Sequence, residues 1–351
     1  MKLWIYTIRR LLLFIPTLIG LTFIVFVLTH VSGTNIILSE YLSPRLTGAA
    51  RAAVVQKLIL QFHLNQPIYI QFFYWIYQIL QGNWGLTHTP IYTGTVNTAI
   101  ALFLPNTIIL SALAAVLIWV IGVPLGVYSA VHRDSAADHS LRVGSFTLYS
   151  MPPYLIGLVL IILLGVWLKW LPVAGVVDPS LVGGLSWYVG GISYPTHILL
   201  IDALLHGSWN VAYNAFLHLL LPAVTLALAV VAGVIRILRS SMLEVLDQDY
   251  IRLARSKGIS ENLVNNLHAR KNALLPFLTT FGLTVAGLLG GVVVIETIFS
   301  YPGIGYWTTQ ALLYSDVGGI MAATLIFGLI LMTTNLIVDL LYAFIDPRIR
   351  Y

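Results

Sequence analysis

Long apolar runs separated by polar segments set the pattern of this 351-residue chain. The first run, Leu11–Leu28, would reach roughly 27 Å as a helix at about 1.5 Å per residue, which is close to the thickness of a hydrocarbon core. Later runs of similar or greater length are Leu104–Ala130, Val143–Trp167, Ala215–Leu238, Pro276–Phe299 and Gly318–Phe344. The pattern predicts an all-α integral membrane protein with six transmembrane helices.

The basic segment Lys2–Arg10 before the first run also fits a secretory signal peptide. The run is long for that purpose, and no clear Ala-x-Ala site follows it. We therefore expect residues 1–31 to form a retained first transmembrane helix. In the second run, Gly122, Pro124 and Gly126 predict a kink, and the third run contains Pro152 and Pro153.

Residues 32–98 are polar and mixed, with repeated proline and glycine, and we expect them to form an extracytoplasmic lobe. Within it, Ala49–Leu60 and Ile68–Leu80 read as short amphipathic helices, and the aromatic residues of the second suit a position at the headgroups. Residues 99–351 are then expected to form a five-helix core. This core includes an outer loop, 171–214, and a cytoplasmic loop, 239–275.

The composition is 58% hydrophobic and only 9% charged, which excludes an ordinary soluble protein. Cysteine is absent, so disulfides and thiolate metal sites are excluded. The net charge of +5 at first suggests nucleic acid. However, only four of the 18 Lys and Arg residues fall in predicted outer segments: Arg45, Arg51, Lys57 and Lys169. This bias predicts a cell-membrane protein with both termini in the cytoplasm.

The sequence lacks the motifs of the common catalytic sites. No lysine follows a glycine, so the phosphate-binding Gly-x-x-x-x-Gly-Lys loop is absent, and no zinc-protease or serine-hydrolase motif is present. His206, Asn210, Asn214 and His218 recur every four residues, which we interpret as a polar helix face rather than a metal site. We therefore expect no catalytic residue, metal site or cofactor in this chain.

Acidic residues in the predicted spans lie near their ends. Glu296 and Asp339 are each about nine residues, or roughly 13 Å, from the middle of a span, which favours structural hydrogen bonds or ion pairs. Nothing ionisable occupies a span centre. This disfavours a self-sufficient secondary carrier or channel, which remains an alternative, and we recognise no constellation for a membrane-embedded enzyme.

The longest charged segment is Glu244–Gly258, in the cytoplasmic loop. Asp249 is predicted to cap a short helix that starts at Tyr250. Arg255 and Lys257 fall in its last turn, and Gly258 is the expected stop. Ser260 and Glu261 are predicted to cap a second helix that runs to Leu274, before Pro276 opens the next span.

Four residues of the first short helix share one face by helical spacing: Tyr250, Leu253, Ala254 and Lys257. Small and apolar residues on the solvent side of a membrane loop indicate docking into a groove on another protein. The alternative is an ordinary basic loop. Such a loop needs neither caps nor a glycine stop, so the pattern favours docking.

The segment Tyr250–Gly258 with Asn272–Pro276 resembles the cytoplasmic EAA loop of ABC importer permeases, in the version of the dipeptide/oligopeptide/nickel group. Arg252 and Leu253 stand where the general pattern has Glu and Ala. Ser32–Asn35 departs from the usual outer turn of the family. Further segments fit in order: Arg9–Pro16, Asn65–Pro67, Trp170–Pro172, His218–Pro222, Arg239–Glu244, Glu296–Gly305 with Pro302 and Gly303, Asn335–Asp339 and Asp346–Arg348.

The resemblance implies the first, or B-type, permease of a prokaryotic importer with the type I permease fold. It implies a C-type permease partner, an outer substrate-binding protein, and two cytoplasmic ATPases that carry ATP and Mg. The helix Tyr250–Ser260 would insert into an ATPase groove. The expected cargo is oligopeptide, with oligosaccharide as the alternative. Nickel has little support because no His or Met cluster lines a span.

Overall fold

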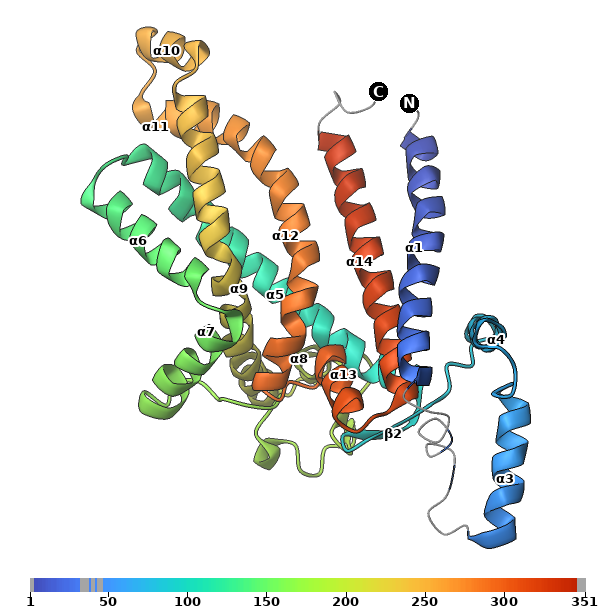
Figure 1. The fold of residues 1–351 in the computed structure, drawn as a ribbon. Helices are drawn as coiled ribbons and strands as arrows, with labels where there is room; N and C mark the ends of the chain where they lie inside the picture. Colours follow the sequence, from blue (N-terminus) through green and yellow to red (C-terminus); the bar gives the residue numbers. More distant parts are fainter. Residues whose placement is uncertain (1–2, 32–37, 39–41, 43–46, 346–351) are drawn as a thin grey trace. The chain divides into compact units, whose positions relative to one another are not determined.

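The computed structural model describes residues 3–31, 38, 42 and 47–345, and for parts of its terminal helices and of α12 it describes the backbone alone (Figure 1). The outer turn Ser32–Asn35 and the C-terminal segment Asp346–Arg348 lie outside the described residues. The chain divides into two compact units. One contains Met1–Thr7, Ile108–Tyr301 and Thr333–Tyr351, and the other contains Ile8–Thr107 and Pro302–Met332.

The predicted all-α membrane fold is confirmed. Four helices in the described part of the chain are long and apolar enough to span a membrane: α1 (Leu3–Val31), α5 (Val96–Val131), α9 (Trp209–Leu246) and α14 (Val317–Ile345). The fifth run forms the 29-residue helix α12, Arg270–Ile298. The six predicted runs thus correspond to these five helices and one bent pair.

The run Val143–Trp167 does not form one straight helix. Helix α6 (Ala136–Ser150) and helix α7 (Pro153–Leu160), which continues as a π-helix through Trp167, meet at an angle of 108°. Pro152 is extended, with ψ near 143°, and Pro153 opens the new helix. A proline disfavours helical geometry in the residue before it but suits a first helical position, so Pro152-Pro153 ends one helix and starts another.

Helix α5 runs unbroken through Gly122, Pro124 and Gly126. The two glycines allow a close approach to α9. A Cβ on Gly122 would lie 2.6 Å from a methyl group of Val234, and one on Gly126 would lie 3.0 Å from Cβ of Leu238. Helix α9 also packs against α6, α7 and α12, so it is the central element of its unit.

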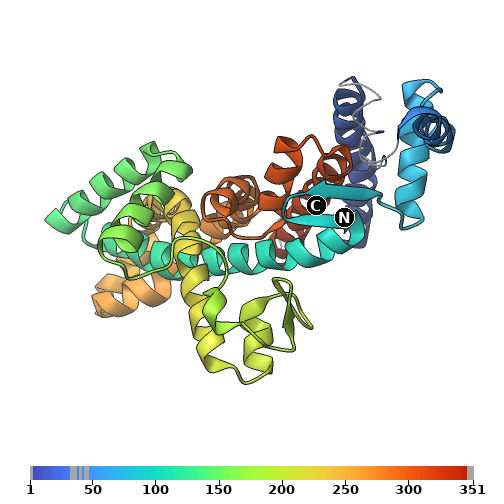
Figure 2. The same ribbon diagram turned by 90° about the horizontal axis from the view of Figure 1, so that it is seen from below.

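The outer segment 171–214 is more structured than a loop. It contains a 3₁₀ turn (Pro179–Leu181), the short hairpin β3–β4 (Tyr188–Val189 and Ile192–Ser193) and α8 (Leu199–Leu205), which packs beside the first turns of α9 (Figure 2). Its own small core joins Val177 and Val182 to Leu199 and Val211.

The predicted polar face of His206, Asn210, Asn214 and His218 is wrong for His206, whereas the other three lie on α9. His206 ends α8 and stacks on Trp187, with ring centroids 4.8 Å apart, so it is not on the helix that carries Asn214 and His218. The Asn214 side chain instead accepts a hydrogen bond from the backbone N–H of Asp178 at 2.9 Å. No group of three potential metal ligands occurs in the part of the chain that the structure describes.

The second unit contains both predicted amphipathic helices, α3 (Gly48–Gln61) and α4 (Ile68–Leu80). An unpredicted antiparallel hairpin, β1 (Leu86–Thr89) with β2 (Tyr92–Thr95), contacts α13 (Ile304–Leu313). Buried Asp316 holds the hairpin, because its carboxylate accepts hydrogen bonds from the Thr87 hydroxyl and from the His88 N–H at 3.0 Å.

Pro302 and Gly303 join α13 to α5 within this unit. The Pro302 carbonyl accepts a hydrogen bond from the Asn106 side chain at 3.0 Å. Gly303 precedes α13 as its N-terminal cap residue, and the next N–H, that of Ile304, donates to the Thr107 hydroxyl at 2.8 Å. Both residues therefore sit in an ordered joint between helices.

Candidate functional site

The charged segment projects beyond the end of α9 as a bent element (Figure 1). After α9 ends at Leu246, the chain forms α10 (Asp249–Ser256), then the single turn α11 (Glu261–Leu263) and the π-helix η3 (Val264–Ala269). We call residues 249–269 the coupling element, after the docking role that the sequence predicts for this segment.

The predicted second helix begins where expected, with Glu261 directly after Ser260, but its predicted end at Leu274 is wrong. The chain passes from α11 through η3 directly into α12, so position 276 lies inside a helix rather than opening one. A proline inside a membrane helix removes one hydrogen bond but is tolerated where neighbours satisfy the freed groups. Because the helical path is unbroken from α11 to α12, the coupling element is continuous with α12.

Gly258 stops α10 as predicted. Its φ is +77°, in the left-handed region that favours glycine. Its N–H donates to the Arg255 carbonyl at 2.9 Å, and the N–H of Ile259 donates to the Ala254 carbonyl at 3.3 Å. These two bonds define a Schellman motif, which satisfies the last carbonyl groups of the helix. Ile259 is partly buried against the same core as Ala254.

The predicted cap at Asp249 is wrong. Gln248, with extended backbone, is the cap residue of α10, and no side chain caps the helix. Asp249 is the first helical residue, and its almost fully exposed carboxylate lies 3.4 Å from Nη1 of Arg252. Its charge still lies in the first turn, where it favours the helix dipole. Ser260 likewise precedes α11 without a side-chain capping bond.

The predicted apolar face of α10 is only partly correct. Ala254 is buried and packs in the same core as Val264 and Ala269 of η3, together with Ile251, which the sequence analysis missed. Tyr250 and Leu253 are 43% and 55% exposed. The helix has two apolar stripes, one that anchors it to its own chain and one that faces outward. The i, i+3 spacing of Ile251 and Ala254 was the available signal.

Polar contacts hold α10 against the segments that follow it. Arg255 bridges the Gly258 turn to Glu261, with Nε–Oε1 and Nη2–Oε2 distances of 2.8 and 3.3 Å. The side-chain amide of Asn272, in α12, donates to the hydroxyl of Tyr250 at 3.0 Å. The exposed side chains Arg252, Leu253 and Lys257 thus lie on a braced basic and apolar surface, which suits binding to another protein.

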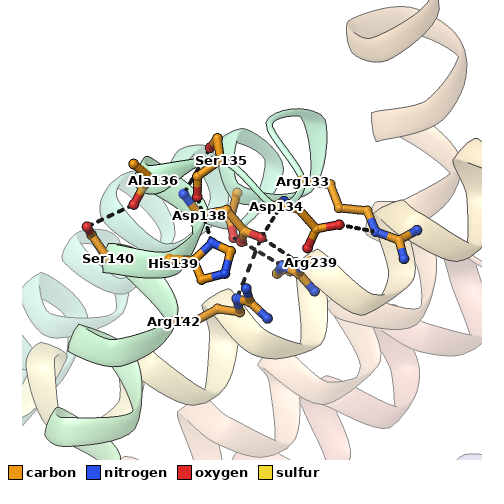
Figure 3. Close-up of polar contacts among 10 residues, drawn as sticks. Arg133, Asp134, Ser135, Ala136, Asp138, His139, Ser140, Arg142 and Arg239 are labelled. Atoms are coloured by element: carbon orange, nitrogen blue, oxygen red, sulfur yellow. Dashed lines mark hydrogen bonds and ion pairs between the residues drawn. The ribbon is translucent and has the colours of Figure 1, made fainter.

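A buried carboxylate behind this surface joins three helices (Figure 3). Asp138, in α6, is fully buried. Arg239, in α9, donates from Nε and Nη2 to its two oxygens, each at 2.8 Å, and Ser129 of α5 donates from its hydroxyl. The Asp134 N–H donates to it at 3.0 Å. The bidentate geometry makes this a strong charge-assisted contact.

Sequence reasoning missed this contact, because its two partners are 101 positions apart. A local signal existed in Ser135-x-x-Asp138, a capping pattern. The Ser135 hydroxyl does accept a hydrogen bond from the Asp138 N–H at 3.2 Å, which starts α6. We call Asp138, Arg239 and Ser129 the inner clamp.

The remaining residues singled out in the sequence have different surroundings. Glu244 is exposed, and its carbonyl accepts a hydrogen bond from the Gln248 side chain. Glu296 is fully buried two residues before the end of α12, and its carbonyl accepts a hydrogen bond from the Tyr301 N–H at 2.8 Å. The side chains of Pro276 and Asp339 lie outside the described residues.

Comparison with known proteins gives a consistent result. Residues 122–351 match the family described as binding-protein-dependent transport system inner membrane component. The chain is 37% identical over 347 residues to the oligopeptide transport system permease protein AppB of Bacillus subtilis (strain 168), with 99% of each chain covered. It is 38% identical over 311 residues, 87% of each chain, to the probable D,D-dipeptide transport system permease protein DdpB of Escherichia coli (strain K12). It is 34% identical over 353 residues to the dipeptide transport system permease protein DppB of the same strain, with 99% of this chain and 98% of that one covered.

Proposed function

The chain belongs to the family of binding-protein-dependent transport system inner membrane components, and from this premise we propose that it forms half of an oligopeptide import path that works by alternating access. The proposal that the cargo is oligopeptide rests on the similarity, over nearly the whole length, to permeases named for oligopeptide and dipeptide transport. The other half of the path would be a C-type permease, and an outer binding protein would deliver the cargo.

ATP hydrolysis is assigned to two partner ATPases, which would carry ATP and Mg, and this chain supplies no catalytic residue. One ATPase would dock on the exposed surface of the coupling element. The proposed contact residues are Asp249, Tyr250, Arg252, Leu253, Arg255 and Lys257. Gly258 shapes this surface, and Ala254 anchors it to the chain's own core.

The packing of α10 suggests how movement would be transmitted. Ile251 and Ala254 share a core with residues of η3 and of α9, including Leu238 and Met242. A displacement of α10 by nucleotide-driven closure of the ATPases would therefore reach α9 and α12 together. These helices would then shift between inward-facing and outward-facing arrangements.

Deletion of the gene in its native host tests the function. Uptake of labelled oligopeptides should fall to background and should return on complementation with the intact gene. Labelled oligosaccharide uptake serves as the second arm of the experiment. Loss of oligosaccharide uptake with unchanged peptide uptake would reject the peptide assignment in favour of that alternative.

Leu253→Asp tests the docking surface. Leu253 is 55% exposed, so the aspartate should be tolerated by the fold but should weaken ATPase binding by about tenfold or more, as expected for a central interface residue. Co-purification of the ATPases with the tagged permease measures this loss. Leu313→Asp, at a 70% exposed position in α13, is the control. Equal ATPase recovery from both variants would reject α10 as the docking helix.

A further inference from the structure

A cavity of about 390 Å³ lies between α6 and α9, beside the inner clamp. It is separate from the coupling element, and the proposed transport function does not use it. Its charged lining consists of the arginines Arg142, Arg236 and Arg239. The hydroxyl-bearing side chains Ser145 and Ser240 also line it. The lining therefore offers many hydrogen-bond donors and no acidic side chain.

The charge of the cavity is not balanced. Arg239 is committed to the buried carboxylate of Asp138, and Arg142 lies 3.6 Å from the same carboxylate while its side chain stays 44% exposed. The guanidinium of Arg236 lies over the ring of Tyr149, 4.9 Å from its centroid. Among the residues that the structure describes, no carboxylate forms an ion pair with Arg236. Three positive charges thus face one negative charge, which favours binding of an anion.

One wall of the cavity is apolar and open. Phe146 and Tyr149, on α6, are 74% and 59% exposed, and Val143 beside them is 67% exposed. Ile235 and Leu243 contribute apolar surface from α9. A small soluble anion has no need of such a wall. A molecule with an anionic head and an apolar tail complements both parts of the lining.

The depth of the arginines in the membrane agrees with the position of lipid headgroups. Arg142 lies six residues after the start of α6, or about 9 Å along the helix, and Arg236 lies ten residues before the end of α9, or about 15 Å. The start of α6 lies beside the end of α9 that leads into α10, because Asp138, near that start, binds Arg239. By the charge bias of the sequence, this end faces the cytoplasm. The cavity therefore lies near the inner headgroup region.

We propose that this cavity binds an anionic phospholipid of the inner leaflet. Arg142 and Arg236 hold the phosphate oxygens, a geometry that guanidinium groups match well. Basic pockets between transmembrane helices on the cytoplasmic side are suited to such headgroups. Ser145 and Ser240 add hydrogen bonds, and Phe146 and Tyr149 contact the glycerol and the first part of the acyl chains. The bound lipid joins α6 to α9 next to Asp138.

Native mass spectrometry of the assembled importer tests the proposal. The complex is purified from membranes and exchanged into nanodiscs of phosphatidylcholine with or without phosphatidylglycerol, and the lipids retained after release are counted. The wild-type complex should retain phosphatidylglycerol in preference to phosphatidylcholine. Removing each arginine should lower the affinity about fivefold, so the double variant Arg142→Gln/Arg236→Gln should lose the preference.

Arg133→Gln is the matched control, because Arg133 is an exposed arginine of the neighbouring turn that pairs with Asp134 outside the cavity. It should retain the lipid as the wild type does. Equal retention of phosphatidylglycerol by the double variant would overturn the proposal. So would displacement of the lipid by inorganic phosphate alone, which would indicate a free-anion site. Loss of the partner permease with unchanged lipid retention would show a subunit interface instead. None of these experiments measures transport, so their outcome does not depend on which cargo the importer carries.

Discussion

Gly258→Val should abolish transport and release the ATPases from the complex. The position has a φ of +77°, where a β-branched residue is strained, and the cost is about 1–2 kcal/mol or more. A Cβ at this position would meet no atom within 4 Å, so the strain comes from the backbone and not from a clash. Relief of the strain would break the Schellman bonds and turn α10 away from the core. Peptide uptake and ATPase co-purification measure the effect.

Gly258→Asn is the control for this variant. Asparagine tolerates the left-handed conformation better than other side chains, so it should keep most of the transport activity. Unchanged uptake and ATPase recovery in the valine variant would reject the assignment of this turn to coupling. Equal loss in both variants would indicate that side-chain volume, and not backbone conformation, matters at this position.

Asp138→Ala should destabilise the protein by about 3–5 kcal/mol, because it leaves the partly buried Arg239 without the carboxylate that compensates its charge. The Ser129 hydroxyl and the Asp134 N–H also lose their acceptor. Helices α5, α6 and α9 would lose their common contact at the end nearest the coupling element. The thermal unfolding midpoint of the purified complex measures the change.

Two further variants make this result specific. Asp134→Asn removes a charge from the neighbouring turn and keeps a residue that tolerates the left-handed backbone of this position, where φ is +62°. Both partners of its ion pair with Arg133 are more than 60% exposed, so the midpoint should hardly change. Asp138→Ala/Arg239→Met removes both buried charges and should recover much of the stability, since an apolar replacement of a whole buried pair is often tolerated. No recovery in the double variant would contradict the charge argument.

The sequence allowed prediction of those features that depend on local chemistry. Gly258 ends α10 because few other residues adopt its backbone conformation, and Ile68–Leu80 is a helix with the bounds that its pattern indicated. The inward stripe of α10 could not be predicted as easily. Leu253 and Ile251 are both apolar, and only the packing of η3 against one side decides that Ile251 is buried and Leu253 exposed.

Contacts between distant segments were beyond prediction from one sequence. Asp138 and Arg239 each read as ordinary charged residues of cytoplasmic loops, and neither position indicates the other. The hairpin Leu86–Thr95 was missed for a related reason. Its strands are four residues long, and its geometry depends on Asp316 and Trp307, which bind Thr87 from more than 200 positions away.

The link between α9 and α10 is short, so under the proposed docking on α10 it would limit which ATPases this permease can share with other importers. It contains only Asp247 and Gln248, which would span at most about 7 Å when extended. Gln248 is further held, since its N–H donates to Val245 and its carbonyl accepts from Ile251 and Arg252. A docked ATPase would have to present its groove at a fixed height and angle. Whether one ATPase can replace another would then depend more on the geometry of this link than on the chemistry of the cargo.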